Sequence, residues 1–260
     1  MINSLWISKT GMEAQQTQLD VIANNLANVS NNGFKKAHVV FEDLMYQNLR
    51  QAGANNSEQS TLPTGLQVGL GVRIVGTSRD FIEGGVQTSE NPLEMRVSGN
   101  GFFQLTMPDG TIGYTRNGNF SLSPSGQLVS QNGLPVAGGI TVPPGATAFT
   151  VASDGAVTVS LDGGKTNQSI GNITLASFIN PAGLDPKGQN TFTETVASGQ
   201  PSVGAPNTNG LGAVFQKSLE TSNVNVVQEL VTMIQTQRAY EMNSKAIQTS
   251  DQMLQKLGQL

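Results

Sequence analysis

A seven-residue repeat of apolar side chains near each end of the chain constrains its fold more than any other feature of the sequence. Near the N-terminus the repeat comprises Leu5, Met12, Leu19 and Leu26, with Ile22 and Val29 at its second position. Near the C-terminus it comprises Val226, Met233, Tyr240, Ile247 and Leu254, with Leu230 widening the apolar face. A strict seven-residue repeat keeps one narrow face of a helix turned toward a partner helix. We therefore predict a long helix at each end, and a coiled-coil seam between them formed by these residues.

The ends of the two predicted helices carry residues that favour stopping and starting a helix. The first helix is expected to run from about Ile2 to Val29 or Asn31, because the Asn and Gly residues that follow adopt the left-handed backbone that ends a helix. The second helix is expected to begin beside Ser222 or Asn223, since either side chain is a good N-cap. This helix then continues almost to the last residue.

The remaining faces of both helices are polar but carry few charges. In the first helix, Asn and Gln stand where a solvated helix usually has Lys and Glu. We expect these faces to be covered by further helices, which points to a polymer. Trp6 is interpreted either as a neighbour of the seam or as an anchor into a second subunit. Gly11 is interpreted either as a residue that the helix tolerates, at a cost of about 1 kcal/mol in helix stability relative to Ala, or as a small residue that admits a neighbouring chain.

The middle of the chain has the pattern of a β-rich domain. From residue 84 to about 212, short apolar runs alternate with turn dipeptides such as Asn117–Gly118, Asn132–Gly133 and Asp154–Gly155. Many short strands at this spacing predict an all-β body, either a sandwich or an irregular barrel. The fold class is therefore α+β, with two paired terminal helices around a central all-β domain.

An extended arm is expected between the first helix and the β-rich body. Residues 34–50 fit either a strand or a short helix, and residues 51–63 are expected to form a loop or arm. Residues 65–82 alternate apolar and polar side chains, which predicts a long strand or hairpin arm. The predicted domains are residues 1–32 with 223–260 for the helices, 33–83 with 211–222 for the connecting arm, and 84–210 for the outer β-rich domain.

The composition excludes several classes of function. Only 12% of residues are charged and the net charge is −4, which gives no electrostatic reason to expect nucleic acid as a partner. The chain has no cysteine and one histidine, His38, for which no catalytic partner can be specified. The acidic residues Glu42, Asp43, Asp154 and Asp162 are interpreted as surface or turn residues. We therefore predict no catalytic residue, cofactor or metal, no membrane-spanning segment and no cleaved signal peptide.

Two motifs next to the heptads resemble those of the bacterial flagellar rod and hook proteins. The N-terminal motif includes Ala23, Asn24, Asn25, Leu26, Ala27 and Asn28, followed by Gly33 and Phe34. The C-terminal motif includes Ser222, Asn223, Val224 and Asn225, followed by Arg238, Ala239 and Tyr240. The segments 99–103 and 114–120 also look like the β-domain of this family, so the resemblance covers the whole chain.

The resemblance implies a structural subunit of the distal rod, a rigid helical tube that transmits torque from motor to hook. It further implies an inner coiled-coil layer, an outer β layer and an arm that bridges neighbouring subunits. The implied partners are further copies of the chain, the proximal rod and hook-side proteins, the surrounding ring proteins and the export apparatus. The implied location is the flagellar basal body, from periplasm to outer membrane, after export without signal cleavage. The alternatives are a proximal rod or hook protein, or a secreted β-rich adhesin oligomerised by its terminal helices.

Overall fold

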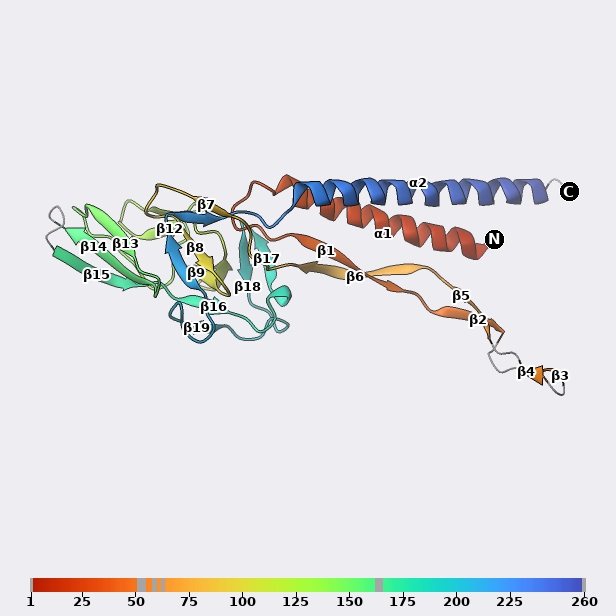
Figure 1. Cartoon of the computed structure of the whole chain (residues 1–260), viewed down its shortest axis with the longest axis horizontal. Coiled ribbons are helices and arrows are strands. Elements are labelled where there is room, and N and C mark those ends of the chain that lie inside the picture. Colours follow the sequence, from red (N-terminus) through yellow and green to blue (C-terminus); the bar gives the residue numbers. More distant parts are fainter. Residues whose placement is uncertain (1, 51–54, 58–59, 62–63, 162–165, 259–260) are drawn as a thin grey trace. The chain divides into compact units, whose positions relative to one another are not determined.

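The fold is α+β, with one long helix at each end of the chain and a central β domain (Figure 1). The computed structural model describes residues 2–50, 55–57, 60–61, 64–161 and 166–258. Its contacts divide the chain into two compact units. Unit 1 comprises Met1–Leu26, Ala37–Ser78 and Asn225–Leu260, and unit 2 comprises Ala27–Lys36 and Arg79–Val224.

The N-terminal helix of unit 1, α1 (Ile2–Ala27), confirms the helix predicted from the first heptad. It ends two to four residues before the predicted stop. The chain then turns through Asn28 and Asn31, whose backbone amide donates to the carbonyl of Asn28 at 3.1 Å. Gly33 follows in the left-handed conformation, with φ of 72°. The Asn- and Gly-rich segment therefore ends the helix for the predicted reason.

The C-terminal helix, α2 (Val226–Leu257), begins at a different N-cap from the one predicted. The side chain of Asn225 accepts hydrogen bonds from the amides of Val227 and Gln228. The prediction of Ser222 or Asn223 as the cap is therefore wrong. The Ser222 hydroxyl instead accepts from the amide of Val224, and the Asn223 carbonyl oxygen accepts from the amide of Lys36.

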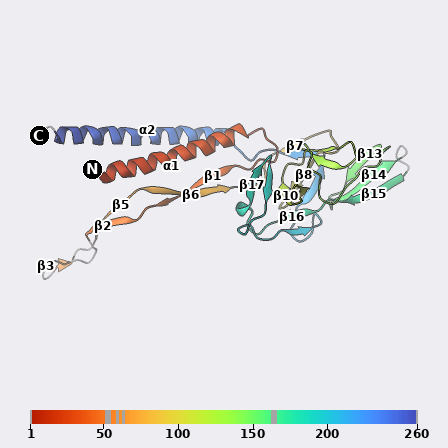
Figure 2. The ribbon, with the colours of Figure 1, turned by 180° about the vertical axis from the view of Figure 1, so that it is seen from behind.

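The two helices lie side by side within unit 1 (Figures 1 and 2), and polar side chains form hydrogen bonds between them. Asn243 of α2 donates to Oε1 of Gln15 at 3.2 Å, and Asn25 of α1 donates to Oε2 of Glu229 at 3.4 Å. A Cβ atom added to Gly11 would lie 3.1 Å from Nδ2 of Asn243. Gly11 therefore admits a close neighbour, and that neighbour is α2 of the same chain.

Unit 1 also contains an antiparallel ribbon, which decides what residues 34–50 form. In the ribbon β1 (Ala37–Asp43) pairs with β6 (Val72–Arg79), β2 (Tyr46–Arg50) pairs with β5 (Leu66–Gly69), and β3 (Asn55–Ser57) pairs with β4 (Ser60–Thr61). The segment 34–50 thus forms strands. Residues 51–54, 58–59 and 62–63 of the expected loop lie outside the described residues.

The long strand expected over residues 65–82 is interrupted between β5 and β6. Gly71 has φ of 116°, which only glycine adopts readily. Its carbonyl accepts from the amide of Leu44, and a Cβ atom there would lie 2.3 Å from the Thr10 hydroxyl of α1. The ribbon therefore bends where its backbone meets α1.

Unit 2 is the β-rich body. Its largest sheet has six antiparallel strands in the order β17 (Asp185–Gly188), β18 (Thr191–Thr193), β10 (Ile112–Thr115), β9 (Phe102–Thr106), β16 (Leu175–Ser177) and β19 (Ser202–Gly204). A second sheet contains β13 (Ala148–Val151), β14 (Ala156–Leu161) and β15 (Thr166–Asn172). The described part of the unit also contains three two-stranded sheets: β7 (Val86–Thr88) with β21 (Ser218–Glu220), β8 (Met95–Ser98) with β20 (Ala213–Gln216), and β11 (Phe120–Leu122) with β12 (Leu128–Ser130). A short 3₁₀ helix, η2 (Pro181–Gly183), lies before β17.

The six-stranded sheet separates two hydrophobic cores. Successive strand residues point to opposite faces. On β9, Phe102 accordingly lies in the smaller core, whereas Phe103 lies in the larger one. On β16, Leu175 lies in the larger core and Ala176 in the smaller one. Every residue from Phe102 to Leu105 is buried, because both faces of this strand are covered.

Candidate assembly interface

The predicted seam residues of α1 are partly covered within the single chain. Ile22 is buried, and Leu5, Met12, Leu19, Leu26 and Val29 are half-buried. In α2, Met233 and Ile247 are half-buried, whereas Val226, Leu230, Tyr240 and Leu254 are exposed. Their role as the seam of an assembled coiled coil therefore stays a prediction.

The side of α2 that meets α1 carries a second, polar seven-residue repeat. It comprises Glu229, Thr236, Asn243 and Ser250. Glu229 and Asn243 make the hydrogen bonds to α1, and Thr236 and Ser250 are buried. The contact between the helices within one chain thus includes small and polar side chains.

An apolar stripe lies on the opposite side of the first half of α2. It consists of Val227, Leu230, Val231 and Ile234, which are 70%, 45%, 48% and 52% exposed. The spacing of i, i+3, i+4 and i+7 places these four side chains on one helical face, away from Glu229 and Asn243. We call this set the outer stripe. The heptad missed Val227 and Val231, although the 3.6-residue period would have found both.

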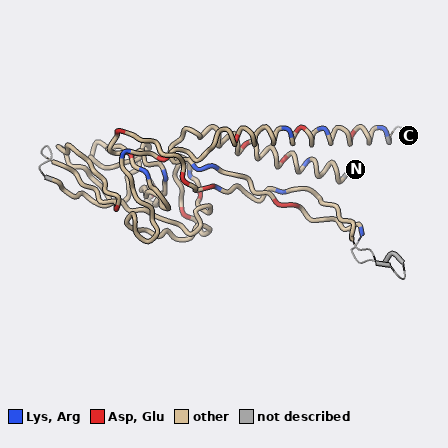
Figure 3. The backbone as a smooth tube through the Cα atoms, in the orientation of Figure 1, with Lys and Arg blue, Asp and Glu red and all other residues tan. Residues whose placement is uncertain are grey.

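Further apolar side chains are exposed on the ribbon and at the start of α1. On the ribbon, Met45, Tyr46, Leu49, Leu66 and Val75 are all more than half exposed. Trp6 is also exposed, with the Lys9 amine 5.2 Å from its ring centroid. Contiguous exposed apolar groups are typical of surfaces that a partner covers. Charged residues are sparse along α1 (Figure 3), so a partner that covers this helix would bury few charges.

The N-terminal family motif joins α1 to the start of the ribbon. Asn25 accepts from the amide of Ala37 at 3.0 Å and donates to its carbonyl at 2.9 Å. Leu26 and Asn28 are half-buried, and Ala23, Asn24 and Ala27 are exposed. In the C-terminal motif Arg238 and Tyr240 are exposed, and Ala239 is half-buried.

Gly33, Phe34, Ser222, Asn223 and Val224 of the two motifs belong to the β-rich unit. The Gly33 amide donates to the Glu220 carbonyl at 2.8 Å, and a Cβ atom on Gly33 would lie 2.6 Å from the amide nitrogen of Asn117. Phe34, Ser222 and Val224 are buried. Gly33 is therefore required both for its backbone conformation and for close packing.

Three buried charged side chains meet beside these motifs. Lys35, Glu220 and Arg116 have side chains 0%, 4% and 3% exposed. The Lys35 amine lies 2.6 Å from Oε1 of Glu220, and Nη1 of Arg116 lies 3.5 Å from Oε2. Burial lowers the pKa of Lys35, against the opposing attraction of Glu220, and burial likewise lowers the pKa of Arg116. No sequence pattern had singled out these three as a group.

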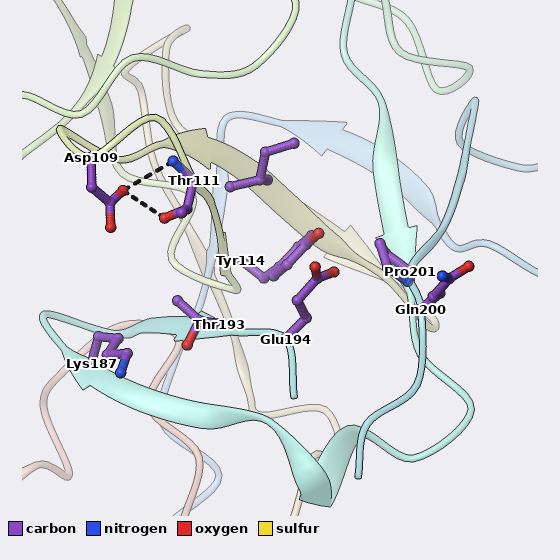
Figure 4. Close-up of a pocket in the computed structure, with 9 residues that line it drawn as sticks. Asp109, Thr111, Tyr114, Lys187, Thr193, Glu194, Gln200 and Pro201 are labelled. Atoms are coloured by element: carbon purple, nitrogen blue, oxygen red, sulfur yellow. Dashed lines mark hydrogen bonds between the residues drawn. The ribbon is translucent and has the colours of Figure 1, made fainter. Parts of the chain in front are cut away.

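A groove of about 720 Å³ is lined by residues of β10, β17 and β18 and by Gln200 and Pro201 (Figure 4). Its walls include Tyr114 and Glu194, and burial together with this carboxylate raises the pKa of Tyr114 to about 12. Asp109 is engaged by the amide and hydroxyl of Thr111.

Two of the acidic residues singled out in the sequence have structural partners. Glu42 pairs with Arg73 at 2.7 Å on the ribbon, and Asp154 accepts from the amide of Ala156 in a turn. Asp162 lies outside the described residues. Across the ranges that the structure describes, no group of three metal-ligating side chains occurs, and no helix is long and apolar enough to cross a membrane.

Three family models match this chain. They are "Flagella basal body rod protein" at residues 6–35, "Flagellar hook protein FlgE/F/G D1 domain" at 96–159 and "Flagellar basal body rod FlgEFG protein C-terminal" at 216–260. The chain is 53% identical to "Flagellar basal-body rod protein FlgG" of Buchnera aphidicola subsp. Schizaphis graminum, over 100% of both chains. It is 44% identical to the protein of the same name from Borreliella burgdorferi, over 98% of this chain and 97% of that one. It is 43% identical to the protein of that name from Caulobacter vibrioides, over 100% of this chain and 99% of that one.

Proposed function

Because this chain belongs to the FlgE/F/G family of flagellar rod and hook proteins, we propose that it is a structural subunit of the distal rod. Its role is to assemble with copies of itself into a rigid helical tube that transmits torque from motor to hook. The single observation that carries this proposal is identity of 43–53% along the full chain to proteins named FlgG. These relatives favour a rod subunit over a hook protein or an adhesin. The function is structural, not enzymatic.

We propose that the terminal helices build the inner layer of the tube. Within one chain α1 and α2 are joined by hydrogen bonds between polar side chains, and the outer stripe stays exposed together with Val226, Tyr240 and Leu254 of the α2 heptad. Copies of the chain would cover both sets, and the heptad residues would then form the coiled-coil seam. Burying apolar area in this way is the main driving force for association.

The ribbon is proposed to act as an arm that bridges neighbouring subunits. Its exposed apolar side chains and the free edges of its two-stranded pairings suit it to packing against another copy. The β-rich unit would form the outer layer of the tube. This division follows the three predicted domains, except that residues 211–222, predicted with the arm, belong to the β-rich unit.

The remaining partners follow from a position in the basal body. The tube would join the proximal rod at one end and the hook-side proteins at the other, with ring proteins around it. We further propose that it spans from the periplasm to the outer membrane. The flagellar export apparatus would deliver the subunit without cleavage of a signal peptide.

Electron microscopy of the concentrated full-length protein tests the proposal. The expected result is tubes of uniform diameter that lengthen with protein concentration. Discrete trimers or other closed oligomers at every concentration would overturn it in favour of an adhesin-like protein. Basal bodies isolated from a strain expressing a tagged copy provide a second test, because the tag must then lie along the distal rod.

A further inference from the structure

The chain passes between its two compact units four times, after residues 26, 36, 78 and 224. On the side of the β-rich unit, these connections end at Ala27, Lys36, Arg79 and Val224. A load carried along the chain from one unit to the other passes through these four connections. The contacts that hold them on the β-rich unit are therefore of mechanical interest.

A closed ring of hydrogen bonds joins three of the connections. The Lys36 amide donates to Oδ1 of Asn223 at 2.8 Å, and Nδ2 of Asn223 donates to the Asp80 carbonyl at 2.8 Å. The Asp80 amide then donates to the Lys36 carbonyl at 2.9 Å. One asparagine side chain thus ties together segments that are distant in the sequence.

The buried charges lie next to this ring and connect the same segments. The Lys35 amine donates to Glu220 and to the Ile82 carbonyl, each at 2.6 Å. Arg79 donates to the Lys35 carbonyl at 3.1 Å, and the Gly84 amide donates to Oε1 of Glu220 at 3.0 Å. Glu220 therefore receives hydrogen bonds from both neighbouring segments.

Arg116 fastens this group to the body of the unit. Its guanidinium donates to the carbonyls of Gly99 at 2.7 Å and Val97 at 3.3 Å, in addition to its contact with Glu220. Val97 belongs to the larger hydrophobic core. The first connection is held separately, since Asn190 donates to Oδ1 of Asn31 and to the carbonyl of Asn32, both at 2.9 Å.

We propose that Lys35, Arg116, Glu220 and Asn223 form a clamp, a set of positioning residues that binds the connections at Lys36, Arg79 and Val224 into one mechanical unit. Load on one of these connections is then shared by all three. Buried ion pairs add little net stability but hold one geometry, and losing one partner leaves a charge buried and unpaired. The sharing of load rests on the proposed function as a torque-transmitting subunit, whereas the coupling of the segments does not.

Hydrogen exchange of the full-length protein tests the coupling. In Glu220→Gln and in Asn223→Ala, amides of residues 33–36, 79–85 and 219–224 should all exchange about tenfold faster or more. The amides of β9 and β14 should keep their protection. Asn223→Ala is the milder change because Asn223 is only half-buried, so it remains informative if Glu220→Gln does not fold.

The matched control is Lys187→Met, compared with Lys35→Met. Lys187 pairs with Asp185 at 2.8 Å in the same unit but is 53% exposed, so its loss should leave the exchange of all three segments unchanged. Faster exchange only in the segment that carries each substitution would overturn the clamp. Equal effects of Lys35→Met and Lys187→Met would overturn it as well.

Swimming in media of increasing viscosity tests the sharing of load. Wild-type protein must first form rods in a strain that lacks its own rod subunit; if it forms none, the proposed function fails and the exchange result still decides the coupling. Where rods form, Asn223→Ala should yield a normal number but lose speed more steeply with viscosity than Lys187→Met. Identical speeds of the two variants at every viscosity would overturn load sharing.

Discussion

Replacing Val231 tests whether the outer stripe of α2 joins one subunit to the next. Val231 is 48% exposed, so about half of its side chain is left for a second subunit to cover. Truncation to alanine removes two methyl groups, worth about 0.8 kcal/mol each when fully buried and about half of that here. A loss of about 0.8 kcal/mol per contact corresponds to a three- to fourfold higher critical concentration for assembly, by order of magnitude.

Aspartate at the same position should have a far larger effect. An unpaired carboxylate in a covered contact costs several kcal/mol, so a loss of about 3 kcal/mol raises the critical concentration more than about a hundredfold. The dilute monomer should melt within a few degrees of wild type, because Val231 is already about half exposed to solvent within the single chain.

The assay is sedimentation of polymer over a series of protein concentrations, with circular dichroism of the dilute monomer. Thr249→Asp is the matched control, since Thr249 is exposed and lies 18 residues, or about five turns, further along the same helical face. Assembly of Val231→Asp at the wild-type concentration would refute the role of the outer stripe. Equal impairment by Thr249→Asp would show that any charge on that face is enough.

Three further predictions concern the β-rich unit. Lys35→Met should lower the free energy of unfolding by about 3–5 kcal/mol in urea titrations, because it leaves Glu220 buried with a weaker partner; a change below about 1 kcal/mol contradicts this. Gly33→Ala should lower the free energy of unfolding by at least about 2 kcal/mol, because alanine there strains the left-handed backbone and clashes with Asn117. Gly110→Ala is the control: Gly110 has φ of 82° but open space around it, so the loss should come from backbone strain alone and be smaller. The pKa of Tyr114, about 12 in the folded state against 10.0 for the free side chain, means that the folded state binds more protons between these values. The free energy of unfolding should therefore fall as pH rises from about 10 to about 12, and Tyr114→Phe should remove part of this fall.

The long helices and the β-rich middle of the chain could be predicted from the sequence, because each rests on a local period. Apolar residues seven apart repeat over several turns in both α1 and α2, and short runs between Asn–Gly and Asp–Gly pairs mark strands and turns. The family motif from Ala23 to Phe34 was equally readable. The N-cap was misplaced because Ser222, Asn223 and Asn225 are all good caps. In the structure Ser222 and Asn223 accept other hydrogen bonds, from Val224 and Lys36, so Asn225 caps the helix.

The partner of each helical face was decided by the tertiary structure. Glu229, Thr236, Asn243 and Ser250 repeat every seven residues just as the apolar set does. A period specifies which residues share a face, but not which face meets α1 and which is left for another chain. The hydrogen bonds of Asn243 and Glu229 assign the polar face to the contact within the chain.

The buried charges depend on tertiary structure even more strongly. Lys35, Arg116 and Glu220 are far apart in the sequence, and charged residues are normally exposed, so no local pattern marks them as partners. They meet because the segment after α1 and the segment before α2 both return to the same strands of the β-rich unit. The sequence by itself thus determined the elements and the family, whereas the long-range pairing of those elements decided which side chains hold the connections and which stay available for assembly.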